Sequence, residues 1–168
     1  MLGPQLWVDA KGRPELRQEL FEPVRNESFM KPRGGLWTST FRPKTGSDWI
    51  EWCKSEQFWL PPYRSWLVVP RRDARVLVID NEADAVEAVK VYGREDARQK
   101  LLGGMMFDFE KLAQDYDAMH LTKRGQIETR FSYDVNLWGW DCESTVWFRW
   151  VFAEVRWLGE LDFDEEAM

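Results

Sequence analysis

The chain has 168 residues, of which 44% are hydrophobic and 31% are charged, a composition typical of a soluble globular domain. Its formal net charge of −6 lacks the basic excess of proteins that coat nucleic acid, so bulk nucleic-acid binding is not expected. The two cysteines, Cys53 and Cys142, lie far apart and outside any paired motif, which argues against a disulfide framework and against a metal site.

The first third of the sequence predicts short strands followed by a helix. We expect the strands at 5–9, 19–25 and 36–40. Pro23 places the second strand near an edge, because proline cannot donate to a ladder. Ser47 is a candidate N-cap for a helix over 48–56, whose core-facing side chains would be Trp49, Trp52 and Cys53.

The middle of the sequence predicts two strands and two helices. The strands are expected at 66–69 and 76–80. Asp80 or Asn81 would cap a helix over 82–92, and a second helix over 109–114 would begin after Asp108. The first of these helices would present one apolar face made of Ala83, Val86 and Val89. The segment 94–104 gives a weaker pattern that ends at Gly103 and Gly104.

Strand patterns dominate the last third, at 115–122, 127–133 and 144–155, and the last of these would be the longest strand. The sum is a single compact α+β domain over 1–160, mostly antiparallel, with two to four short helices. An acidic tail over 161–168 is expected to fray. The start of the chain lacks the features of a signal peptide and no apolar run has membrane-spanning length, so we expect a cytoplasmic protein with no membrane partner.

A glycine pair, Gly34 and Gly35, suggests a first candidate site. Basic side chains flank the pair, namely Lys31, Arg33, Arg42 and Lys44. Backbone N–H groups of glycine beside cationic side chains would suit a phosphate or diphosphate. The alternative is a solvated loop that turns the chain into a buried strand, since the segment matches no known phosphate-binding fingerprint.

Two carboxylates suggest a second candidate site. Asp141 and Glu143 are two positions apart and would point to one face if a strand begins there. One of them could bind a ribose hydroxyl or stabilise a cationic transition state, or both could belong to a capped strand end. His120 is the only histidine, and a structural hydrogen-bonding role is favoured for it over catalysis. Cys142 has acidic neighbours, which disfavour a thiolate nucleophile.

Three segments resemble a family of uncharacterised proteins from actinobacteria and their bacteriophages. They are "KPRGGLWTST" with the following "SDWIEWC", "DYDAMHLTKRGQIETR", and "LWGWDCESTVWFRW". The motifs can be written KPxGGLWTS and LxGWDCESTxWF. This resemblance covers most of 20–152 and implies a source rather than an activity.

A more remote resemblance, to ADP-ribosyltransferase-like enzymes, implies an activity. In those enzymes a strand that carries an aromatic residue and ends in a small hydroxyl residue leads into a helix. The aromatic residue stacks on the nicotinamide of NAD. "GLWTS" at 35–39 resembles this element, with Trp37 as the stacking residue and Thr38 or Ser39 positioning a ribose. "WDCES" at 140–144 resembles the later strand, whose acid holds the ribose and stabilises an oxocarbenium-like transition state; here that acid is Glu143.

The resemblance implies NAD as the substrate and a host macromolecule as the acceptor of ADP-ribose. The family's first-strand His or Arg has one candidate, Arg25 in "EPVRN". The remaining expected contacts to the dinucleotide are the glycine-turn residues Lys31, Arg33 and Gly35. Two other hypotheses remain open. One is a non-catalytic protein that binds a host protein through its tryptophans. The other is a nucleic-acid binder that uses Arg71, Arg72 and Arg75.

Overall fold

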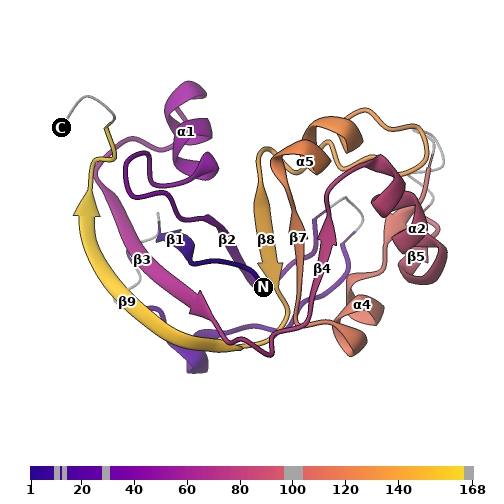
Figure 1. The fold of residues 1–168 in the computed structure, drawn as a ribbon, viewed down its shortest axis with the longest axis horizontal. Coiled ribbons are helices and arrows are strands. Elements are labelled where there is room, and N and C mark those ends of the chain that lie inside the picture. The colour runs from indigo at the N-terminus through magenta and orange to yellow at the C-terminus, as the bar shows by residue number, and fades with distance from the viewer. Residues whose placement is uncertain (10–11, 13–14, 28–30, 97–103, 165–168) are drawn as a thin grey trace.

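One mostly antiparallel sheet organises the chain, and the computed structural model describes all residues except 10–11, 13–14, 28–30, 97–103 and 165–168 (Figure 1). Its strands are β1 (Gln5–Asp9), β2 (Leu36–Thr40), β3 (Tyr63–Pro70), β4 (Val76–Ile79), β7 (Ala118–Leu121), β8 (Ser144–Trp147) and β9 (Phe152–Leu161). Their order across the sheet is β4-β7-β8-β2-β1-β3-β9. Only the β4–β7 pair within this sheet is parallel.

Among the described residues, four α-helices cover the two halves of this sheet. They are α1 (Asp48–Ser55), α2 (Glu82–Tyr92), α4 (Phe109–Asp115) and α5 (Lys123–Thr129). Figure 1 shows α1 beside the β1–β3 half, whereas α2, α4 and α5 gather around β4 and β7. The smaller elements are a 3₁₀ turn, η1 (Gln18–Leu20), and a two-stranded ribbon of β5 (Gly93–Arg94) and β6 (Met106–Phe107). The expected α+β domain with two to four short helices is therefore confirmed.

Three helices, α1, α2 and α4, begin where the sequence predicts, because each has a polar side chain at its N-cap. Ser47 accepts from the N–H of Ile50, and Asn81 rather than Asp80 caps α2. Asp108 accepts from the N–H of Lys111 and so caps α4. Each of these bonds satisfies one of the amides that the first turn of a helix leaves without a partner.

The β2 strand changes partner halfway along its length. Residues Leu36, Trp37 and Thr38 pair with β8, whereas Ser39 and Thr40 pair with β1. The β8 strand leaves β2 at this point, and Figure 1 shows the two halves of the sheet splaying apart. The polar side chains described below lie at this division.

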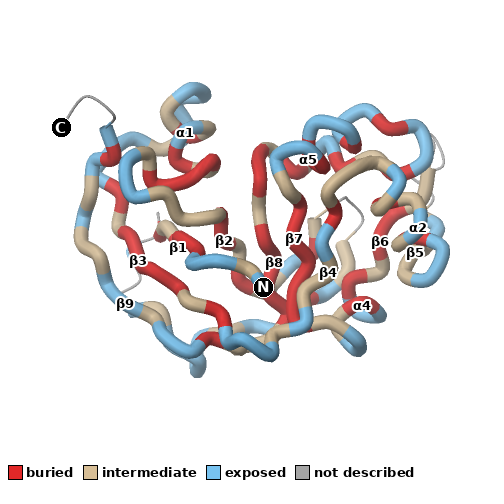
Figure 2. Tube along the Cα trace, viewed as in Figure 1, coloured by how far each residue is buried: buried red, intermediate tan, exposed pale blue. Residues whose placement is uncertain are grey.

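Three hydrophobic clusters fill the space around the sheet, and Figure 2 shows their backbone as buried segments in the middle strands. The largest packs α2 and α4 against β7 and includes Trp140 and Leu112. The second surrounds Trp147, and the third places Ile50 and Cys53 of α1 against Leu6 of β1. Most tryptophans therefore serve in packing, which is the usual role of a large aromatic side chain.

Three predicted strands differ from the structure. Residues 19–25 form no strand, because η1 occupies their start and only an isolated bridge joins Arg25 to Arg33. The segment predicted as a strand over 127–133 begins inside α5 instead, because Thr122 caps a helix there. The strand predicted over 144–155 is two strands, β8 and β9, separated by 148–151.

Smaller predictions also need correction. Ala83 is exposed, and the buried face of α2 is formed by Ala85 and Val89. Two residues of the tail that was expected to fray are part of the fold, because Leu161 ends β9 and Phe163 is buried in the third cluster. The segment 97–103, which contains most of the weak pattern at 94–104, lies outside the described residues, as do 165–168 of the tail.

None of the helices among the described residues has the length and apolarity needed to cross a membrane.

The glycine turn is a tight crossing of three chain segments. Gly34 and Gly35 have φ values of +74° and +68°, in the left-handed region that glycine tolerates best. A Cβ on Gly34 would lie 2.2 Å from the carbonyl oxygen of Pro23, and one on Gly35 would lie 2.7 Å from that of Trp147. The pair therefore lets β2 pass directly over these two backbones.

We expect Gly34→Ala to lower the free energy of unfolding by about 2 kcal/mol or more, since the left-handed conformation alone costs a side-chain-bearing residue about 1–2 kcal/mol. The clash with Pro23 adds to that loss. Gly3→Ala is the matched control, because a Cβ there meets nothing within 4 Å. Urea denaturation of both variants measures the difference. Equal stability of the two would contradict the described crossing.

Candidate functional site

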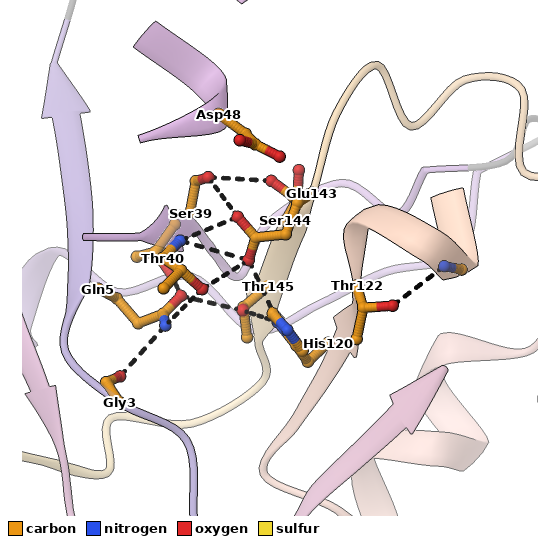
Figure 3. Close-up of polar contacts among 12 residues, drawn as sticks. Gly3, Gln5, Ser39, Thr40, Asp48, His120, Thr122, Glu143, Ser144 and Thr145 are labelled. Atoms are coloured by element: carbon orange, nitrogen blue, oxygen red, sulfur yellow. Dashed lines mark hydrogen bonds and ion pairs between the residues drawn. The ribbon is translucent and has the colours of Figure 1, made fainter. Parts of the chain in front are cut away.

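A buried carboxylate closes the gap that opens between β2 and β8. Glu143, just before β8, accepts hydrogen bonds at Oε2 from Ser39 Oγ at 2.6 Å and from the backbone N–H of Thr40 at 3.0 Å (Figure 3). The hydroxyl of Thr40 donates to Oε1 at 2.8 Å. The side chain of Glu143 is only 6% exposed.

The direction of the backbone groups along β2 explains why a carboxylate is needed here. Successive N–H groups of a strand point to opposite sides. The N–H of Phe41 donates to Pro4 on the β1 side, so the N–H of Thr40 points toward β8. Since β8 has already diverged, Glu143 supplies the acceptor that the ladder no longer provides. A carboxylate that accepts from a backbone N–H and two hydroxyls offsets much of its desolvation cost.

A chain of directed hydrogen bonds extends from this carboxylate beneath the sheet. Trp147 Nε1 donates to the Thr38 hydroxyl at 2.8 Å, and that hydroxyl donates to Gln5 Oε1 at 3.1 Å. The hydroxyl of Thr145 donates to the same oxygen at 3.0 Å. Gln5 Nε2 in turn donates to Thr40 Oγ1 at 3.4 Å. Gln5 therefore connects β1, β2 and β8 within one buried network.

His120 joins the network from β7. Its Nδ1 lies 2.7 Å from Thr145 Oγ1 and 3.5 Å from Glu143 Oε1. Because the Thr145 hydroxyl already donates to Gln5, Nδ1 must carry the proton in this arrangement. Burial lowers the pKa of His120, and this outweighs the opposing attraction of Glu143 and Asp80. His120 is therefore a neutral, buried hydrogen-bonding residue, as the strand pattern predicts.

A pocket of about 440 Å³ lies beside this network, bounded by β1, β2 and α1. Its size is within the range of small-molecule sites. Its walls are Leu6, Trp7, Val8, Asp9, Lys31, Gly35, Leu36, Trp37, Thr38, Ser39, Trp49, Phe58, Trp59, Asp141, Cys142 and Ser144. Ser39 is the link to the carboxylate, because it lines the pocket and its hydroxyl bonds Glu143.

An ion pair lies at the pocket wall above Trp37. Lys31 Nζ is 2.9 Å from Asp141 Oδ2 and 5.6 Å from the centre of the Trp37 ring. Trp140 packs edge-on against Trp37, with ring centres 4.9 Å apart. The Trp37 ring is therefore held between a buried aromatic neighbour and a cation.

The structure brings together most of the residues expected to bind a dinucleotide. The pocket is lined by Lys31, Gly35, Trp37, Thr38 and Ser39. Arg25 and Arg33 are not among its lining residues, and they form ion pairs with Glu110 and Glu27.

Two expectations from the sequence do not match the structure. One is that the glycine turn binds a phosphate, and the other is that Asp141 and Glu143 share one face of a strand. The N–H of Gly35 donates to the carbonyl of Glu22 at 2.7 Å, so a phosphate would have to compete for it. Arg42 is engaged by Asp48 and Glu51. Asp141 faces Lys31 at the pocket, whereas Glu143 is buried against β2, and β8 begins only at Ser144.

The thiols are suited to packing rather than to nucleophilic attack. Burial raises the pKa of Cys142 to about 12 and that of Cys53 to about 11. Among the residues that the structure describes, no group of three or more His, Cys, Asp and Glu side chains is placed to hold a metal ion.

Two parts of the site were not predicted from the sequence. The first is the polar support under the sheet, Gln5, Thr40 and Thr145; polar residues in otherwise apolar strands are the signal that could have revealed it. The second is the far wall of the pocket, which Trp49, Phe58 and Trp59 form only after the chain folds back over β1. The spacing of residues in the sequence does not predict that wall.

Comparison with known proteins gives no relative: no family model, no curated protein and no solved structure matches this chain.

The buried imidazole makes stability depend on pH. Because the folded pKa of His120 is below its unfolded value of about 6.5, the unfolded chain takes up a proton first as the pH falls. We expect the free energy of unfolding to decrease from pH 7.5 to pH 5.5, by up to about 1.4 kcal/mol per pH unit. His120→Gln should remove most of this slope, because the chain has no other histidine.

Urea denaturation of the wild type and the variant at several pH values provides the measurement. The carboxylates whose pKa is lowered in the fold, such as Asp108 and Asp117, lose their contribution at more acidic pH. Parallel pH profiles for the two proteins would show that His120 is not buried in its neutral form.

Proposed function

We propose that the pocket binds NAD and that the protein is an NAD-dependent mono-ADP-ribosyltransferase acting on a host macromolecule. The observation that carries this proposal is that an aromatic ring and a hydroxyl line the pocket, while a carboxylate that does not itself line it lies directly behind the hydroxyl. Trp37 and Ser39 of β2 line the pocket, and Ser39 is hydrogen-bonded to the buried carboxylate of Glu143. The resemblance to ADP-ribosyltransferase-like enzymes implies that an aromatic surface and a hydroxyl bind NAD and that a carboxylate stabilises the transition state.

The chemistry would use binding geometry and charge placement. Trp37 would stack on the nicotinamide ring, and Ser39 would contact the adjoining ribose. As the bond between the ribose and nicotinamide breaks, positive charge develops on the sugar and nicotinamide leaves neutral. Glu143 would stabilise that charge until an acceptor nucleophile bonds the anomeric carbon and releases a proton. This role requires the Ser39 hydroxyl to give up its place on Oε2 to the substrate.

A second candidate function is binding of a host protein without catalysis, as expected of a phage accessory protein. Two observations favour it. Glu143 is buried and already accepts three side-chain and backbone donors, as a structural carboxylate does. Phe131 and Tyr133, in the segment after α5, are 77% and 81% exposed, as residues of an interface often are.

The nucleic-acid hypothesis gains less support. Arg71 pairs with Asp73, and Arg75 pairs with Asp117, so two of the three expected arginines face carboxylates. Phosphate contacts would have to displace these partners.

We expect millimolar NAD to raise the thermal unfolding temperature of the wild type. A ligand at 100 times its dissociation constant adds about 2.7 kcal/mol, which is several degrees for a domain of this size. Trp37→Ala should abolish the shift. Trp157→Ala is the matched control, since Trp157 lies on β9 against Trp66 and does not line the pocket. A shift that persists in Trp37→Ala would place NAD elsewhere.

We expect Glu143→Gln to abolish transfer of ADP-ribose, measured as release of nicotinamide, without preventing NAD from binding. The amide is close to the carboxylate in shape but does not stabilise developing positive charge. It also places a donor among donors, so the variant should lose about 1–3 kcal/mol of stability, and folding must be checked by circular dichroism. Full activity in a folded variant would remove Glu143 from the mechanism.

A further inference from the structure

We propose that the pocket selects a flat organic cation, a pyridinium ring, and that Lys31 occupies the cation position as an internal competitor when no ligand is bound. The inference rests on the proposed function in taking this pocket as the ligand site. It assigns Lys31 a role opposite to that of a phosphate-binding lysine.

Aromatic side chains form much of the pocket wall. They are Trp7, Trp37, Trp49, Phe58 and Trp59. Trp49 and Trp59 pack edge to face with ring centres 5.4 Å apart, and Phe58 stacks on Trp59 at 5.5 Å. Contacts among the rings therefore fix the wall in place. The face of such a ring attracts a cation through its quadrupole, and Lys31 already lies over the face of Trp37.

The charged groups of the pocket favour the same kind of ligand. Asp9 and Asp141 line it together with a single cation, Lys31. A phosphate group at the position of Lys31 would meet the carboxylate of Asp141 and an ammonium group that this carboxylate already pairs. A pyridinium ring would instead meet carboxylates and aromatic rings, which both stabilise positive charge.

Lys31 already makes the contacts that such a ring would make. Its ammonium group is 2.9 Å from Asp141 and within cation–π distance of Trp37, at 5.6 Å from the ring centre. The two side chains of the ion pair are 41% and 34% exposed, and pairs that water reaches contribute little net stability. A ligand cation that buries more aromatic surface than an ammonium group can therefore displace Lys31 toward solvent.

The test compares two probes that differ in charge, 1-methylnicotinamide (a cation) and nicotinamide (neutral), by ligand-observed NMR titration. We expect the wild type to bind the cation about tenfold more tightly, a difference typical of a partly desolvated cation–π and carboxylate site. Lys31→Met should bind the cation more tightly than the wild type, with little change for nicotinamide. Asp141→Asn should lose the preference. Lys90→Met, which breaks an ion pair with Glu87 on α2, is the matched control.

Three outcomes would overturn the inference. They are equal binding of the two probes by the wild type, weaker binding of the cation by Lys31→Met than by the wild type, and no binding of the cation by the wild type or by Lys31→Met. A parallel titration with NAD separates the inference from the proposed function. Binding of NAD without a preference between the small probes would leave the proposed function standing and refute the cation site. Binding of 1-methylnicotinamide without NAD binding would do the reverse.

Discussion

The hydrogen bonds of the Glu143 carboxylate are the interaction on which the arrangement of this site depends. The β2 strand serves two halves of one sheet, and the change of partner leaves the Thr40 N–H without a backbone acceptor. Glu143 accepts from that group and from Ser39, so it joins the halves where no ladder does. A buried carboxylate is stabilised only while its donors remain in place. The position of Glu143 and the separation of β2 from β8 therefore depend on each other.

The pocket follows from the same division of the sheet. The side chains of β2 that face it, Trp37 and Ser39, lie where β8 diverges, and the packing of α1 against β1 brings the second aromatic wall into place. Lys31 and Asp141 then meet at the pocket wall from segments more than a hundred residues apart. The site thus combines a rigid floor, set by buried hydrogen bonds, with an ion pair at its wall that water reaches.

The starts of three helices could be predicted from the sequence because they depend on residues close together in the chain. Ser47, Asn81 and Asp108 cap helices because each side chain accepts a hydrogen bond from the backbone N–H three residues later. The strand prediction over 127–133 was wrong because the apolar residues behind it, Ile127, Phe131 and Tyr133, are exposed. Thr122 instead starts a helix, α5, whose buried residues are Gly125, Gln126 and Thr129. The association of Ser39 with Glu143 was expected only through a family resemblance. The spacing of residues along the sequence does not show which distant strands pair. Phe58 and Trp59 could not be predicted at all, because they line the pocket only through tertiary packing.

A crystal structure of the protein grown with NAD would test directly whether a ligand ring binds on Trp37 beside the Ser39–Glu143 pair. We expect a nicotinamide ring over Trp37, Lys31 withdrawn from Asp141, and a ribose hydroxyl within hydrogen-bonding distance of Ser39 or Glu143. A nucleotide bound at another surface, with the Lys31–Asp141 ion pair intact and the pocket empty, would contradict this expectation.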